Sequence, residues 1–364
     1  MHHLNSSDSF AIDYSQARAK FMDAAARAGG TLERISHPER GPDGGDLSCD
    51  VAWFGPRDAE RVLVMISGTH GVEGFCGSGG QVAALHRGET SRLPPGLAVL
   101  MIHAINPYGF AWLRRVTQEN VDLNRNWVNF DGPLPKNAGY DELHPVLCPS
   151  AWTDASRAAG GAAIGAYVQL HGEAALQRAV SGGQYAHASG VFYGGRAPTW
   201  SRRTQTALFE HYLRLARKVA ILDYHTGLGP WGFATQIVTQ PRPSSQFVRA
   251  ARWFGAATTS IYDGDSVSAA IAGDGLSAAA SILSHAEVTV LALEVGTLPT
   301  DQVLEALCAD AWLHAYGDPA SPQGRAIQSQ VRDAFFGDTD DWKGMVVGQS
   351  LLACRQAAAG LMEP

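Results

Sequence analysis

Apolar and polar positions along the chain predict a buried central sheet. Six stretches have the apolar character or the alternation of β-strands: 47–54, 61–67, 97–105, 219–223, 234–239 and 287–293. Three of them, 61–67, 97–105 and 287–293, are continuously apolar, which is typical of strands buried on both faces of a parallel sheet. The pattern therefore favours a central, at least partly parallel, sheet.

Helical periodicity fills most of the chain between and after these strands. Helices are expected at 14–28, 77–86, 152–180, 200–217, 244–254, 301–316 and 321–336, and from 342 onward. A strand, a helix and a second buried strand follow one another between residues 61 and 105, which is a β-α-β unit. No internal repeat, low-complexity tract or linker divides the chain, so a single α/β domain spanning residues 1–364 is expected.

Composition narrows the class of protein. With 45% apolar and 17% charged residues, the 364-residue chain has a globular composition, and its net charge of −7 argues against a general nucleic-acid binder. No apolar run approaches the roughly 20 residues of a membrane helix, and no secretory signal is evident. The cysteines number five, an odd count without a C-x-x-C pair, which fits reduced thiols. A cytoplasmic protein that does not act at a membrane is expected.

The strongest candidate chemistry directly follows the strand at 61–67. His70 and Glu73 are three residues apart in Ser-Gly-Thr-His-Gly-Val-Glu, a spacing found in metal sites. Imidazole and carboxylate are zinc ligands, and a catalytic zinc site takes three protein ligands and keeps one position for water. The pair alone is weak evidence, because a strand-to-helix turn can carry two polar residues for other reasons. A third ligand has to come from elsewhere in the chain.

Two later residues also lie where apolar strands end. His225 follows the strand at 219–223, and Glu294 closes the one at 287–293. In open α/β sheets the carboxyl ends of the strands face one crevice, so His225 is the natural third ligand. A carboxylate after a fully apolar strand needs a partner or water, and Glu294 is therefore expected to act as a general base toward a water molecule.

A stretch between residues 106 and 149 carries donors suited to an anionic substrate. It is rich in Asn, Pro, Gly and Arg, and long irregular loops in compact domains are often functional. Within it, Arg125 offers a planar fork for a carboxylate, and Asn124 adds an amide donor. Arg115 could polarise a scissile carbonyl or stabilise its oxyanion, and Asp122 could orient a metal-binding histidine.

Taken in order, these motifs resemble the zinc carboxypeptidase family. The resemblance rests on His70-x-x-Glu73, on Arg115 seven residues before Asp-Leu-Asn-Arg-Asn-Trp, then on His225 and Glu294, and it runs over nearly the whole chain. It is closest to a bacterial branch known only as a domain of unknown function. A nucleotide-binding G-x-G-x-x-G after a strand, a Walker A sequence and a G-x-S-x-G are all missing from the sequence.

The resemblance implies a fold and a set of roles. The fold would be a mixed sheet of about eight strands between helices. One zinc ion would be held by His70, Glu73 and His225, and Glu294 would be the base and proton shuttle. The residue matching Arg115 stabilises the oxyanion in the family, those matching Asn124 and Arg125 bind the substrate's terminal carboxylate, and the one matching Asp122 supports the first zinc histidine.

Two features depart from the family pattern. Classical members close a tyrosine over the substrate, and Tyr262 is the best candidate here, although an aromatic residue packed at a strand end fits the same sequence. Residues 130–195 form an insertion that is expected to help shape the substrate pocket.

The sequence therefore predicts a zinc hydrolase acting on an amide bond next to a free carboxylate. A metallocarboxypeptidase acting on peptides is the first hypothesis, and an N-acyl-amino-acid amidohydrolase of the desuccinylase or aspartoacylase kind is the second. An esterase could use the same site. A catalytically inactive binding module would have lost a ligand or the base, and none is missing. The oligomeric state is not predicted.

Overall fold

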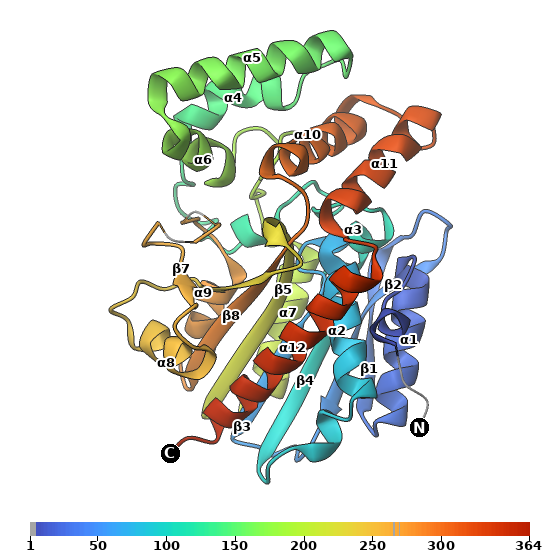
Figure 1. The fold of residues 1–364 in the computed structure, drawn as a ribbon, viewed down its shortest axis with the longest axis vertical. Coiled ribbons are helices and arrows are strands. Elements are labelled where there is room, and N and C mark those ends of the chain that lie inside the picture. Colours follow the sequence, from blue (N-terminus) through green and yellow to red (C-terminus); the bar gives the residue numbers. More distant parts are fainter. Residues whose placement is uncertain (1–4, 265, 269) are drawn as a thin grey trace.

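The eight strands form one mixed sheet. The computed structural model describes residues 5–264, 266–268 and 270–364. In spatial order the strands are β1-β2-β4-β3-β5-β8-β6-β7 (Figure 1). Their bounds are β1 Thr31–Arg40, β2 Asp46–Phe54, β3 Arg61–Ile66, β4 Leu97–His103, β5 Lys218–Trp231, β6 Ala234–Val238, β7 Thr259–Ser260 and β8 Glu287–Gly296.

The centre of the sheet is parallel and its flanks contain the antiparallel pairs. Strand β3 pairs in parallel with β4 and β5, and β5 pairs in parallel with β8. Strand β2 is antiparallel to both of its neighbours, and β6 is antiparallel to β8. The continuously apolar strands are the central ones, as their pattern indicates.

Helices cover both faces of the sheet and one of its edges. Their bounds are α1 Tyr14–Arg27, α2 Gly74–His86, α3 Pro107–Ala111, α4 Ala138–Leu147, α5 Asp154–His171, α6 Glu173–Ser181, α7 Trp200–Tyr212, α8 Ser245–Phe254, α9 Gly275–Ile282, α10 Thr300–Tyr316, α11 Pro322–Phe335 and α12 Asp340–Leu361. Short 3₁₀ turns are η1 Ser6–Ser9, η2 Gly71–Glu73, η3 Thr90–Arg92 and η4 Leu123–Arg125. No helix in the described part of the chain is long and apolar enough to cross a membrane.

Alternate residues of each central strand pack into two separate hydrophobic cores, one on each face of the sheet. Leu63 and Met65 of β3 face the core beneath α2 and α12, which lie across the front of the sheet in Figure 1. Val62 and Val64 face the opposite core, to which α7 and α9 contribute. The two-residue period of a strand accounts for this division, and both faces of the sheet are therefore shielded from water.

This architecture confirms the predicted fold class, a single α/β domain with a mixed eight-stranded sheet flanked by helices. All six expected strands are present, but β1 and β7 were not predicted. Strand β1 is an exposed, polar edge strand that contains Pro38, so its pattern lacks a clear alternation.

The helix expected over 152–180 is wrong as a single element. It is two helices, α5 and α6, separated by Gly172, whose φ of 83° lies in the left-handed region that favours glycine. Helices α4 and α9 were also not predicted. Together α4, α5 and α6 form a layer of their own beyond the carboxyl ends of the central strands, at the top of Figure 1.

Candidate metal centre

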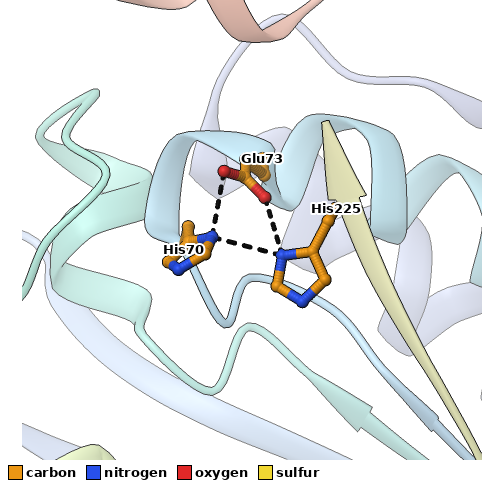
Figure 2. A group of neighbouring side chains, drawn as sticks. All are labelled: His70, Glu73 and His225. Carbon is orange, nitrogen blue, oxygen red and sulfur yellow. Dashed lines mark hydrogen bonds and ion pairs between the residues drawn. The ribbon is translucent and has the colours of Figure 1, made fainter. Parts of the chain in front are cut away.

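His70, Glu73 and His225 meet at the carboxyl edge of the sheet. His70 comes just before η2, Glu73 ends it, and His225 lies on β5 (Figure 2). The Nδ1 atom of His70 is 3.0 Å from Glu73 Oε1 and 3.2 Å from Nδ1 of His225, which is in turn 3.0 Å from Glu73 Oε2. All three side chains are buried. Three residues distant in sequence therefore present ligand atoms to one small volume.

The spacing of these atoms fits a zinc ion. A tetrahedral zinc with ligands at about 2.1 Å has ligand atoms about 3.4 Å apart, close to the 3.0–3.2 Å measured among the three side chains. Two imidazoles and one carboxylate are also the donor set of many catalytic zinc sites. Among the described residues, these three form the only group of histidine, cysteine and acidic side chains close enough together to hold a metal ion.

Each histidine is fixed from behind by an aspartate. Asp122 Oδ1 lies 3.2 Å from Nε2 of His70, and Asp223 Oδ2 lies 3.0 Å from Nε2 of His225. A carboxylate on one ring nitrogen keeps the proton there and leaves the other nitrogen free to bind a metal. Asp122, predicted from the sequence to orient a metal-binding histidine, thus lies beside His70. Asp223 was not predicted, although a residue two positions before His225 on a strand points to the same side.

Arg115 is positioned beside this cluster because its backbone lies close to that of η2. Gly71 and Val72 of η2 donate their N–H groups to the carbonyls of Arg115 and Arg114, at 3.0 and 2.9 Å. A Cβ at position 71 would lie 2.1 Å from the carbonyl carbon of Gly109, so only glycine fits there. The loop that carries Arg115 is therefore bound directly to the turn that carries the first two ligands.

Arg115 contacts the cluster with all three of its nitrogens. Its Nη1 donates to Glu73, its Nη2 lies 3.0 Å from His70 Nε2, and its Nε donates to Asp122 at 3.3 Å. Burial opposes the charge of Glu73, but His70 and Arg115 outweigh it and lower the pKa of that carboxyl. For Asp122, burial is likewise outweighed, by Arg125, Arg115 and His70, and its pKa is well below its usual range. Both carboxylates are therefore held ionised.

Glu294 has a different environment from the other buried carboxylates. It is in register with His225 across the parallel β5 and β8 pair, and its Oε1 accepts a hydrogen bond from Leu228 N at 3.0 Å. Burial, with the negative charge of Glu73 added, raises its pKa to about 7. A carboxyl group tuned in this way can both accept and release a proton near neutral pH.

Asn124 and Arg125 lie on η4, anchored by Asp122 and by the insertion. The backbone N–H of Asn124 donates to Asp122 at 2.9 Å. The side-chain Oδ1 of Asn124 accepts from Gly275 N at 3.1 Å, so the side-chain NH₂ of Asn124 is left to donate to a ligand. Arg125 Nε donates to the carbonyl of Ser181 at the end of α6, at 3.1 Å. The insertion therefore helps to hold the arginine expected to bind a carboxylate.

One cavity of about 500 Å³ joins most of these groups. His70, His225, Glu294, Arg115, Asn124 and Arg125 all line it. One wall is built of apolar residues from β6, β8, α9 and the position just after β7, namely Ile237, Ala292, Leu276 and Ile261. Another comes from α6 and α10, with Leu176, Val180, Val303 and Leu307. A mostly apolar cleft with a few convergent polar groups is the usual form of a small-molecule site.

Of the predicted substrate-binding residues, Tyr262 is the one that the structure does not bring to the cavity. Its side chain is 53% exposed and does not line the cavity, whereas its neighbour Ile261 does. The expected closure over the substrate thus has no geometric support at this residue. Asp274, at the N-cap of α9, and Phe192, in the insertion, line the cavity and were missed, because neither lies in a recognisable motif.

Solved structures with a similar fold include metallocarboxypeptidases. The carboxypeptidase A of Helicoverpa armigera is 13% identical over 90% of this chain and 75% of that chain, with a TM-score of 0.48. A metallo-carboxypeptidase from Burkholderia cenocepacia is 12% identical over 94% and 68%, with a TM-score of 0.41. An aspartoacylase family protein from Mesorhizobium loti is 14% identical over 79% and 67%, with a TM-score of 0.39. At identities of 12–14% and TM-scores below 0.5, these likenesses carry no argument about the chemistry of this chain.

The sheet order and the cluster at its carboxyl edge define an α/β protein with a candidate metal site on a mixed eight-stranded sheet. The chain belongs to the family described as Protein of unknown function (DUF2817), whose model matches residues 10–349. This match confirms the predicted resemblance to a branch known as a domain of unknown function. No curated protein matches the sequence.

Proposed function

We propose that this protein is a zinc-dependent hydrolase that cleaves an amide bond adjacent to a free carboxylate. The observation that carries the proposal is the cavity itself, because it is lined by two of the candidate ligands, His70 and His225, together with the buried Glu294 and two arginines. Glu73, the third candidate ligand, does not line the cavity but lies 3.0 Å from each histidine. A carboxypeptidase-type exopeptidase is our first choice.

The residues of the cavity suit the steps of amide hydrolysis. A zinc ion held by His70, Glu73 and His225 would supply Lewis acidity that acidifies water and polarises the substrate carbonyl. Glu294 accepts a proton from the attacking water and passes it to the leaving amine as the C–N bond breaks. The products are a carboxylate and an amine, so the atoms of water are fully accounted for.

Three side-chain donors, Arg115, Arg125 and Asn124, recognise the substrate carboxylate and stabilise the negative charge that develops on the carbonyl oxygen. Arg115, which reaches the cavity beside His70, is placed to stabilise the oxyanion that forms on the carbonyl oxygen. Arg125 and the amide group of Asn124 bind the substrate carboxylate, which fixes the position of the bond to be cleaved.

A second candidate, an N-acyl-amino-acid amidohydrolase, is favoured by the wall that α6 contributes. Residues of α6 from Glu173 to Ser181 line the cavity on the insertion side, and a wall there suits a short acyl group better than a long peptide. Both candidates use the same metal and base. They differ in substrate length.

Metal analysis combined with a substrate screen tests the proposal. Purified protein is expected to contain about one zinc per chain and to release amino acids from dipeptides or N-acyl amino acids. Glu294→Gln should keep the metal and lose about 10²- to 10⁴-fold in kcat. Glu287→Gln, at the exposed start of the same strand, is the matched control and should behave like the wild type. An active enzyme without metal would contradict the proposal, and activity only on short acylated amino acids would favour the second candidate.

A further inference from the structure

The ring of Phe192 contacts both arginines of the cavity. Its centroid lies 5.4 Å from Cζ of Arg125 and 5.8 Å from Cζ of Arg115, both within the range of a cation–π interaction. Phe192 also lines the cavity. The two guanidinium groups carry like charges, and an aromatic face is one of the few uncharged groups that attract both. A single side chain of the insertion thus touches both candidate substrate-binding cations.

The backbone of Phe192 is in a conformation that a phenylalanine rarely adopts. Its φ of 54° lies in the left-handed region. Such strain persists only where the surrounding structure fixes it, and it is concentrated at functional sites. The next residues do fix it: Tyr193 O accepts from Asp122 N at 2.8 Å, and Gly194 O accepts from Asn126 Nδ2 at 2.8 Å. The strained residue is therefore fastened to the segment that carries Arg125.

The hydrogen bonds that Arg125 makes within the protein leave two of its N–H donors free to bind one carboxylate. Its Nε and Nη2 donate to the carbonyl of Ser181, and its Nη1 donates to the carbonyl of Asn124 at 3.0 Å. A guanidinium has five N–H donors, so these bonds leave one on each Nη atom. Two neighbouring donors form the fork that binds a carboxylate in a bidentate manner. The orientation of the guanidinium plane decides where this fork points.

We propose that Phe192 is a positioning residue for carboxylate recognition, holding the Arg125 guanidinium in the plane that presents its free fork and supporting Arg115 beside it. The inference rests on the proposed function for the roles of the two arginines. The ligand class is a molecule with a free carboxylate next to the amide, which peptides and N-acyl amino acids share. The strained backbone is retained because it places the ring against both cations.

Binding to the zinc-loaded protein in a Glu294→Gln background, used for every variant and for the reference protein, tests this role with little turnover of the probe. The probes are N-acetylleucine, which has a free carboxylate, and N-acetylleucine amide, which is uncharged, both titrated by calorimetry. Phe192→Leu keeps apolar bulk but removes the aromatic face, and it should weaken N-acetylleucine binding by about tenfold while leaving the amide unchanged. Phe192→Tyr keeps the ring and should bind both probes as the reference protein does.

A glycine variant tests whether the ring or the strained backbone matters. Phe192→Gly relieves the left-handed backbone but removes the ring, so it should lose the same preference for the carboxylate as Phe192→Leu. Equal losses for both probes in Phe192→Leu would overturn the inference, because a packing role affects both. Unchanged carboxylate binding, or a reference protein without preference for the carboxylate, would also overturn it. If binding follows the expected pattern but the wild type hydrolyses no amide, the proposed function fails and the positioning role stands.

Discussion

Asp223 and His225 lie on the same strand, and their side chains meet at 3.0 Å between Oδ2 and Nε2. The other oxygen of Asp223 accepts a hydrogen bond from Thr69 Oγ1 at 2.8 Å, which fixes the carboxylate. Burial opposes a charge on His225, but Asp223 and Glu73 outweigh it and hold its pKa well above the usual range. Without a metal, the Nδ1 atom of His225 shares a proton with Glu73. A metal ion can take the place of this proton, while Asp223 keeps Nε2 of His225 protonated.

Replacing this aspartate should weaken metal binding without removing a ligand. Asp223→Asn is expected to lower zinc affinity by about 10- to 100-fold, since the orienting partner of the imidazole is lost. Competition with a chromophoric chelator measures the affinity. Asp58→Asn, at an exposed aspartate, is the control. Equal affinities for the two variants would show that Asp223 does not orient the ligand.

Zinc should stabilise the folded protein through the same three side chains. A metal that binds only the folded state adds about 2.7 kcal/mol at a concentration 100 times its Kd. The melting temperature should therefore fall on treatment with a chelator and recover when zinc is added. His225→Ala should melt at the same temperature with and without zinc, because it lacks one of the three ligands. A zinc-dependent shift that survives in this variant would place the metal elsewhere.

Arg125 should contribute mainly to the binding of the substrate carboxylate. Arg125→Ala is expected to raise KM for carboxylate substrates by about 10- to 100-fold, because hydrogen bonds from a charged donor are lost. Arg125→Lys should restore little of this, since an ammonium group lacks the planar fork. Steady-state kinetics of both variants and of Arg203→Ala, at an exposed position, test the assignment. Unchanged KM values in Arg125→Ala would refute it.

His103 should make stability depend on pH between 4 and 6.5. It is fully buried, its ring stacks on Phe21 at 4.5 Å, and its Nε2 lies 3.0 Å from Ser78 Oγ. Burial lowers its pKa from 6.5 to about 4. In this interval the unfolded state binds a proton that the folded state does not, so the free energy of unfolding should fall as pH decreases, by up to about 1.4 kcal/mol per pH unit.

Urea unfolding of the metal-free protein across this pH range measures the effect. His103→Gln removes the titrating group, so its unfolding free energy should depend less on pH than that of the wild type. His211→Gln changes an exposed histidine and should follow the wild-type curve. A wild-type slope that persists in His103→Gln would assign the pH dependence to other groups.

The central fold was predictable because buried strands have a distinctive pattern of apolar residues in the sequence. Strands that face two cores are continuously apolar, and β3, β4 and β8 were found for that reason. The edge strand β1 buries little, so nothing in its composition separates it from a loop. The break at Gly172 was missed because the apolar periodicity continues across it, while the backbone conformation depends on how α5 and α6 pack.

The site was predictable only as far as its residues follow strand ends. His70 and Glu73 follow β3, while His225 and Glu294 lie within β5 and β8 just past their apolar runs, and the topology brings such positions to one edge. Phe192 belongs to an irregular insertion, and its contact with two arginines depends on a loop conformation that local sequence does not specify. Tyr262 was chosen because classical carboxypeptidases close a tyrosine over the substrate. Its side chain is exposed, so the position of a loop residue in a related family did not predict its place here.

The pairing of β5 with β8 places two residues of the candidate site side by side within the sheet. His225 and Glu294 are direct neighbours in this ladder, so a slip of one residue would turn one of them toward the opposite core. The layer of α4, α5 and α6 contributes to the cavity wall but to neither the ladder nor the ligand set. Under the proposed function, a change confined to this layer would alter the wall of the cavity while His225 and Glu294 keep their places in the ladder.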